Sequence, residues 1–197
     1  MNLPNKLTVL RVILVPVFAV FLMVRLPGDS GETLSRCLAA FFFVLAALTD
    51  LADGKIARKY DLVTDFGKFM DPLADKFMIF AAILGFAASD LYREPAALHV
   101  AVVVCGLIVI FRELAVTSMR LVVAASREKV VVAANWYGKA KTTTQCVWVV
   151  SMIVEPLLPF GEYRVLSWIT VLLMAALTIL SGITYLKEYW RYLDPNR

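Results

Sequence analysis

Hydrophobic and polar residues alternate along the chain in long blocks. Six apolar runs are separated by short polar stretches, at 7–24, 37–49, 77–88, 96–111, 142–158 and 165–185. An α-helix rises about 1.5 Å per residue, so runs of this length, extended by polar ends, reach across a hydrocarbon layer of roughly 30 Å. The pattern predicts an all-α fold, an integral membrane bundle of six transmembrane helices.

The polar stretches suggest where these helices begin and end. Residues 25–36 and 155–164 are rich in glycine, proline and acidic residues, which is typical of turns. We expect the second helix to run from near Leu34 to about Lys59, the third to end near Leu91, and the fourth to begin near Ala96. With no internal repeat or low-complexity tract, residues 1–197 are predicted to form a single membrane domain.

The composition supports the membrane assignment. Hydrophobic residues make up 60% of the chain, more than the surface of a soluble domain of 197 residues allows. The three cysteines stand singly in apolar runs, a pattern that offers neither a disulfide framework nor zinc-ligand spacing: Cys37, Cys105 and Cys146.

The basic residues predict an orientation. If the N-terminus is cytoplasmic, sixteen of the twenty Lys and Arg residues fall on the inner side and four on the outer side. The positive-inside rule then places both termini and the inner loops in the cytoplasm. Basic ends that flank apolar helices are ordinary membrane topology, so we expect no nucleic-acid partner. The outer four are Arg25, Arg36, Arg93 and Arg164.

Four aspartates lie where one apolar run ends and the next begins. Helical spacing places one set on a single face of the second helix: Asp50, Asp53, Gly54 and Ala57. Two steps of four residues place the other set on one face of the third helix: Gly67, Asp71 and Asp75. Each face combines carboxylates with small residues, which leave room for a ligand.

This acidic cluster favours a metal site. Like charges so close together cost free energy unless something neutralises them. Dense oxygen ligands suit Mg²⁺, Mn²⁺ or Ca²⁺ rather than zinc. The alternative is that the acids cap helices and line a solvated turn, which is the role we expect for Thr64 and Asp65. Capping accounts for one acid at a helix end and leaves the other aspartates unexplained.

The same stretch reads D-x2-D-G-x2-A-R-x8-G-x3-D-x3-D and resembles the motif of the CDP-alcohol phosphotransferases at every position. The resemblance implies that Asp50, Asp53, Asp71 and Asp75 hold two divalent cations, Mg²⁺ or Mn²⁺, against the diphosphate of a CDP-linked lipid. It also implies that Asp75 is the catalytic base. The remaining motif residues would bind the CDP-lipid together with Asp53: Gly54, Ala57, Arg58 and Gly67.

The N-terminal segment carries a shorter match. Asn5, Thr8 and Arg11 follow at steps of three, on one face of the first helix. Alone they would be a cap and an interfacial anchor. They also resemble the family's Asn-x-x-Thr-x-x-Arg start, which implies that all three bind the CDP-lipid.

Basic residues gather on the fourth and fifth helices. Arg112 and Arg120 lie two turns apart, and Lys139 and Lys141 stand at the cytoplasmic start of the fifth helix, whose N-terminus itself attracts phosphate. Anchoring of helix ends by snorkelling lysines is the alternative. The group resembles the phosphate pocket of family members that use glycerol 3-phosphate. Tyrosines near the chain end, including Tyr185, are typical of an interfacial aromatic belt.

The resemblance implies a membrane enzyme that transfers the phosphatidyl group of CDP-diacylglycerol to sn-glycerol 3-phosphate, giving phosphatidylglycerol phosphate and CMP. We expect a homodimer in the bacterial cytoplasmic (inner) membrane, with the active site facing the cytoplasm. Alternative acceptors are inositol phosphate, serine or a second glycerolipid, and the basic pocket argues against serine. A cation transporter is the alternative from another class, but transporters more often place their acids near the membrane midplane.

Overall fold

The computed structural model describes the backbone of residues 1–125 and 136–190, and the side chains of 1–123 and 140–190. Within these ranges it is all-helical, as predicted. The six α-helices are α1 (Leu3–Met23), α2 (Gly31–Lys59), α3 (Asp65–Ala88), α4 (Ala96–Ala125), α5 (Trp136–Val154) and α6 (Val165–Tyr189). Of the residues used in the sequence argument, some side chains lie outside the described part: Arg127, Lys129, Lys139, Arg191, Tyr192 and Arg197.

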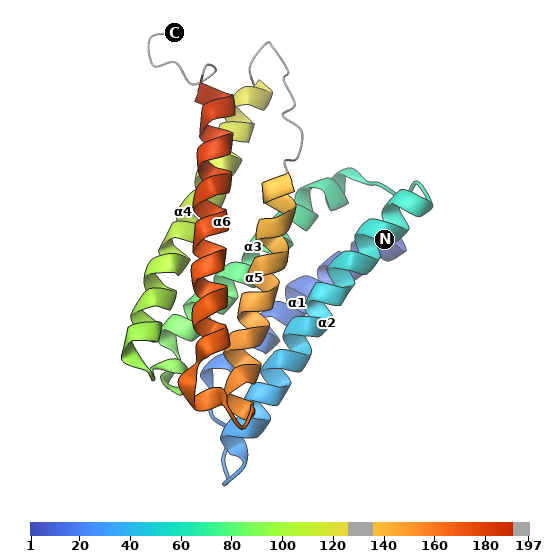
Figure 1. The fold of residues 1–197 in the computed structure, drawn as a ribbon. Helices are drawn as coiled ribbons and strands as arrows, with labels where there is room; N and C mark the ends of the chain where they lie inside the picture. The colour runs from blue at the N-terminus through green and yellow to red at the C-terminus, as the bar shows by residue number, and fades with distance from the viewer. Residues whose placement is uncertain (126–135, 191–197) are drawn as a thin grey trace.

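The helices run up and down in a bundle, and the links 24–30, 89–95 and 155–164 gather at the lower end (Figure 1). Helix α1 packs on α2 and α3, and α6 packs on α4 and α5. Contacts of α2 with α5 and of α3 with α4 join the two groups. The aspartates of α2 and α3 are thereby brought beside the basic residues of α4 and α5.

Local chemistry explains the helix boundaries. The side chain of Asn2 caps α1 by accepting from the backbone N–H of Asn5, and Thr64 caps α3 by accepting from Gly67 N–H. Thr64 is therefore a cap, as expected. Asp65 instead opens the first turn of α3, where it pairs with Lys68 at 3.0 Å.

Three boundaries differ from the sequence expectation. Helix α2 begins at Gly31, three residues earlier than Leu34. Helix α3 ends at Ala88 rather than near Leu91, because the Ser89 hydroxyl accepts from Leu91 N–H and starts a short 3-10 helix, Asp90–Tyr92. Helix α5 ends at Val154 and a 3-10 helix, Glu155–Leu157, follows, since Pro156 has no N–H to continue the α-helix.

The core is apolar and aromatic. Phe18 of α1 meets Phe43 of α2 with ring centroids 5.2 Å apart, and Phe86 of α3 meets Trp148 of α5 at 5.3 Å. The first contact lies within the group α1–α3, and the second joins that group to the group α4–α6. Large apolar side chains also cover the outside of the bundle: Phe111 is 75% exposed and Leu107 61%.

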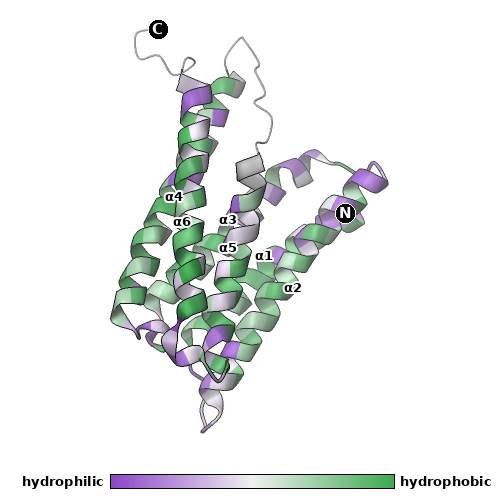
Figure 2. Cartoon of the chain, in the orientation of Figure 1, coloured by the Kyte–Doolittle hydropathy of each residue, from purple (hydrophilic) through white to green (hydrophobic). Residues whose placement is uncertain are grey.

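Figure 2 shows hydrophobic residues along the lengths of the helices and hydrophilic ones mostly near their ends. In the described residues, α1, α2, α4 and the segment 161–189 that contains α6 are each long and apolar enough to cross a membrane. Helix α3 carries charged residues well inside its length, among them Asp71, Asp75 and Lys76, and the described part of α5 begins with polar residues. The chain is an integral membrane protein in which these two helices carry polar residues into the bundle.

Candidate functional site

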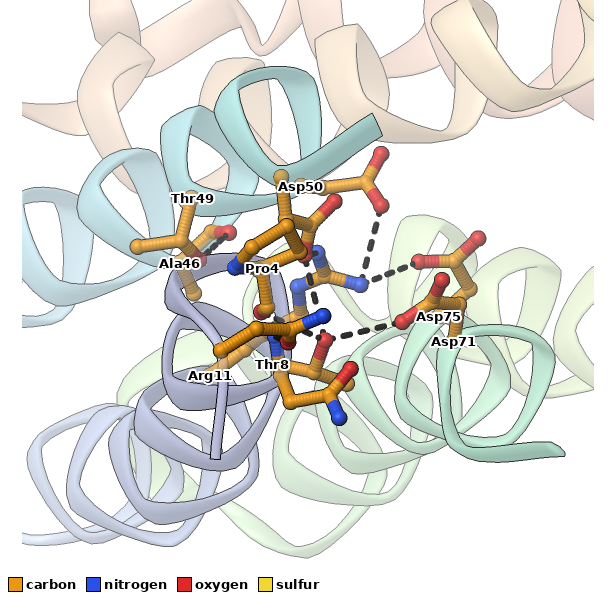
Figure 3. Close-up of polar contacts among 11 residues, drawn as sticks. Pro4, Thr8, Arg11, Ala46, Thr49, Asp50, Asp71 and Asp75 are labelled. Atoms are coloured by element: carbon orange, nitrogen blue, oxygen red, sulfur yellow. Dashed lines mark hydrogen bonds and ion pairs between the residues drawn. The ribbon is translucent and has the colours of Figure 1, made fainter. Parts of the chain in front are cut away.

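A buried arginine stands at the centre of the acidic cluster. Arg11 of α1 is completely buried, and its Nη1 lies 2.9 Å from Asp50 Oδ1 and 2.9 Å from Asp75 Oδ1. Its Nη2 forms an ion pair with Asp53 Oδ2. Figure 3 shows this guanidinium between the carboxylates of α2 and α3. One cation thus bridges three of the four motif aspartates.

The fourth aspartate is joined through a hydroxyl. Thr8, one turn before Arg11 and also buried, donates to Asp71 Oδ1 at 2.8 Å, and its oxygen lies 3.4 Å from Asp53 Oδ2 (Figure 3). Asn5 continues the same face of α1 and accepts from the Thr64 hydroxyl at 2.9 Å. Asn5, Thr8 and Arg11 therefore lie on one face of α1, and Thr8 and Arg11 together contact all four aspartates.

The aspartates that pair with Arg11 differ in how far their side chains are exposed. The side chain of Asp53 is only 4% exposed, whereas Asp50 is 37% and Asp75 44% exposed. Asp50 and Asp75 line a cavity of about 350 Å³. These two carboxylates can reach a ligand there, while Asp53 is held inside by Arg11.

The same cavity contains the basic side of the site. Its wall includes Lys76 of α3, Glu113 of α4, and Lys141 and Thr142 of α5. Asp50, Asp75 and Glu113, from three different helices, therefore line one cavity. The cavity is therefore lined by acidic residues, Asp50 and Asp75, and by basic residues, Lys76 and Lys141.

Ion pairs and hydrogen bonds connect Glu113 and Lys141 of this wall to arginines of α4, which are not among the residues that line the cavity. Glu113 pairs with Lys141 and, at 3.1 Å, with Arg112 Nη1. Arg112 also donates to the Ser181 hydroxyl, and Arg120 donates to the Tyr185 hydroxyl at 2.9 Å. The interpretation of Tyr185 as part of an interfacial belt is wrong: it is 3% exposed and lies among the arginines.

Some residues that contact the basic groups or line the cavity were not among the expected site residues. Ser181 and Tyr185 both contact the basic groups, and Gln145 is buried beside the cavity. The spacing of four between Ser181 and Tyr185 places them on one face of α6, which is the only sequence signal that pointed to them.

The small motif residues leave space as expected. A Cβ placed on Gly54 would meet only Arg58 Nη2, at 3.7 Å. A Cβ on Gly67 would stand 3.3 Å from Asn5 Oδ1 and 3.8 Å from Asp71 Oδ2, so the absence of a side chain lets α1 and α3 approach there. Arg58 is exposed, and Ala57 accepts from Leu62 N–H in the turn after α2.

The donor set fits a divalent cation in its chemistry but not in the present arrangement. Carboxylate oxygens are the ligands that Mg²⁺ and Mn²⁺ take. In the part of the chain with described side chains, no three acidic, histidine or cysteine residues stand close enough together to hold a metal ion. The guanidinium of Arg11 occupies the position between Asp50, Asp53 and Asp75 and supplies the neutralising charge itself.

Known proteins resemble the chain over its whole length. The family model for CDP-alcohol phosphatidyltransferases matches residues 1–181. A Bacillus subtilis protein named CDP-diacylglycerol–glycerol-3-phosphate 3-phosphatidyltransferase is 37% identical, over 99% of this chain and 98% of its own length. Proteins of the same name from Rickettsia felis and Haemophilus influenzae are each 34% identical, with 97% and 94% of this chain covered and 97% and 92% of their own lengths. The chain belongs to the CDP-alcohol phosphatidyltransferase family.

Proposed function

We propose that the protein transfers the phosphatidyl group of CDP-diacylglycerol to sn-glycerol 3-phosphate, with phosphatidylglycerol phosphate and CMP as products. This makes it a transferase of phospholipid biosynthesis. The observation that carries the proposal is one cavity with an acidic wall, where Asp50 and Asp75 lie, and a basic wall that includes Lys141. A diphosphate lipid and a phosphorylated alcohol need these two environments side by side.

The chemistry is a substitution at phosphorus. The acceptor hydroxyl attacks the phosphorus that carries the diacylglycerol, and the bond from that phosphorus to the CMP oxygen breaks. Asp75 takes the hydroxyl proton, since its carboxylate is open to the cavity and four-tenths exposed. Arg112, Arg120 and Lys141 hold the acceptor phosphate, and Lys139 extends this group at the start of α5, although its side chain lies outside the described part.

Two divalent cations, Mg²⁺ or Mn²⁺, would complete the proposed site with Asp50, Asp53, Asp71 and Asp75 as ligands, which requires these carboxylates to leave the arrangement in which Arg11 bridges three of them. Bound there, the cations would supply positive charge that stabilises the diphosphate and the leaving CMP. Thr8 and Asn5 hold the aspartate-bearing helices together. Gly54, Ala57 and Gly67 leave room for the CDP group, and Arg58 lies beside Gly54.

The test is an acceptor assay with the purified protein. CDP-diacylglycerol labelled in its acyl chain is incubated with glycerol 3-phosphate, inositol phosphate or serine, and the label is followed into new lipid. We expect product and CMP release with glycerol 3-phosphate only. Equal product with inositol phosphate would assign a different acceptor, and no product with any of them would overturn the proposal.

The acceptor pocket predicts a selective kinetic effect. Arg120→Gln and Lys141→Gln each remove a charge-assisted contact to the phosphate, worth about 1.5–3 kcal/mol, and should raise the KM for glycerol 3-phosphate by roughly tenfold to a hundredfold. The KM for CDP-diacylglycerol should stay nearly unchanged. Initial rates with each substrate varied in turn measure both constants. Equal changes in both, or none, would contradict the pocket assignment.

The proposed orientation places the site at the cytoplasmic face of the bacterial inner membrane. In a variant without Cys37, Cys105 and Cys146, Ser30→Cys should react with a membrane-impermeant thiol reagent added outside intact cells. Val63→Cys, in the exposed link between α2 and α3, should react only after the membrane is opened. The reverse pattern would refute the orientation that sixteen inner and four outer basic residues predict.

We also expect a homodimer, as the family resemblance implies. Chemical crosslinking in native membranes, compared with the mass of the detergent-solubilised protein, would test this expectation.

A further inference from the structure

Tyr185 of α6 lies against two arginines of α4. The Arg112 and Arg120 guanidinium carbons each stand 5.2 Å from the centroid of its ring. Its hydroxyl accepts a hydrogen bond from Arg120 Nη2 at 2.9 Å. The ring is buried, and its neighbour Tyr189 stacks on it with centroids 6.2 Å apart and the planes inclined by 11°. A single tyrosine therefore contacts two cations that are two helical turns apart.

Other residues of α6 support the same arrangement. The hydroxyl of Ser181, one turn before Tyr185, accepts from Arg112 Nη2. A Cβ on Gly182 would approach Arg112 Cγ to 3.4 Å, so α6 passes close to the stem of that side chain. Arg112 is 9% exposed, and its Nε has no hydrogen-bond partner among the described residues. One face of α6 thus holds an arginine that still has a free donor.

The charges of this group are not balanced within it. Arg112, Arg120 and Lys141 are cations, and Glu113 is the carboxylate that pairs with Arg112 and Lys141. Three cations against one carboxylate leave two positive charges. Two guanidinium groups on one ring repel each other, and the ring and its hydroxyl offset that repulsion. A phosphate monoester, with nearly two negative charges at neutral pH, is the ligand class that this arrangement complements.

We propose that Tyr185 is a positioning residue of the acceptor site: it holds Arg112 and Arg120 together so that both engage a phosphate monoester. The inference rests on the proposed function, in which these arginines bind the acceptor phosphate. Without the tyrosine, Arg112 keeps Glu113 and Ser181. The Arg120 side chain, however, loses its hydrogen-bond partner and has to be ordered by the ligand, and that ordering entropy weakens binding. Loss of Tyr185 should therefore weaken binding of the acceptor and leave binding of the CDP-lipid unchanged.

The experiment compares isosteric and truncated variants. Tyr185→Phe removes only the hydroxyl and should raise the KM and the Kd for glycerol 3-phosphate by roughly threefold to tenfold. Tyr185→Leu also removes the ring and should raise both by roughly tenfold to a hundredfold. The kcat at saturating acceptor and the KM for CDP-diacylglycerol should not change. Calorimetric titration of glycerol 3-phosphate into the detergent-solubilised protein measures the Kd apart from turnover.

Tyr189→Phe is the matched control, because this tyrosine is buried on the same helix one turn further on. It should leave all constants unchanged. Ser181→Ala, which removes the partner of Arg112 without touching the ring, should raise the acceptor KM alone. If Tyr185→Phe changes neither constant for the acceptor, or shifts both substrates equally as a structural defect would, the positioning role is overturned.

Arg120→Gln, measured in parallel, separates this inference from the proposed function. A raised acceptor KM in Arg120→Gln with an unchanged one in both Tyr185 variants would refute the positioning role and leave the pocket intact. An unchanged acceptor KM in Arg120→Gln would refute the pocket itself, and with it the inference.

Discussion

Asp75→Asn should lower kcat by roughly a hundredfold to ten-thousandfold, the range that a positioned general base contributes. Asp75 and Asp50 are the motif carboxylates that line the cavity, and Asp75 also lies next to Lys76 on the cavity wall. An amide of the same size cannot accept the hydroxyl proton. Binding of glycerol 3-phosphate should persist, because Arg112, Arg120 and Lys141 are unchanged.

Two measurements check this expectation. Initial rates give kcat for the variant, and calorimetric titration gives its Kd for glycerol 3-phosphate. Asp65→Asn is the control: this carboxylate belongs to the same helix but is exposed and paired with Lys68 at 3.0 Å, so its loss should change neither value. A normal kcat for Asp75→Asn would show that Asp75 is not the general base.

Withdrawal of divalent cations should stop turnover and yet leave the protein folded. Four carboxylates without any counter-ion would repel one another, but Arg11 bridges Asp50, Asp53 and Asp75 in this structure. We therefore expect activity to disappear in excess chelator and to return with Mg²⁺ or Mn²⁺, while thermal unfolding of the chelated protein remains cooperative. Full activity in chelator would exclude the proposed cations.

Arg11→Met tests the counter-ion directly. Removing one partner of a buried ion pair leaves the other uncompensated, which typically costs about 3–5 kcal/mol. Here the carboxylate left behind is Asp53, whose side chain is 4% exposed. The variant should unfold at a clearly lower temperature in chelator, and Mn²⁺ should stabilise it more than it stabilises the parent protein.

The control for this variant is Lys68→Met, which breaks an ion pair whose lysine is 64% exposed and should cost little. Unfolding temperatures with and without Mn²⁺ provide a readout that does not depend on activity. Equal unfolding temperatures for Arg11→Met and the parent in chelator would show that Arg11 does not neutralise the cluster.

The local structure of this protein could be predicted from its sequence. Hydrophobic runs fixed six helices because burial in lipid acts on each segment separately. Helical periodicity placed Asp50 with Asp53, and Asp71 with Asp75, because residues three and four apart share a face. The acidic motif, through its spacing, also pointed to the family that the comparisons identify.

Contacts between residues far apart in the chain could not be predicted from the sequence and follow from the packing of the helices. Arg11 was expected beside the nucleotide, but packing of α1 between α2 and α3 places its guanidinium among carboxylates that follow it by 42 and 64 residues. Tyr185 looked like an interfacial residue until α6 packed on α4 and enclosed it with Arg112 and Arg120. Periodicity states which residues share a face, but which face meets which depends on how all six helices fill space together, and a buried charge takes whatever partner that packing brings within reach.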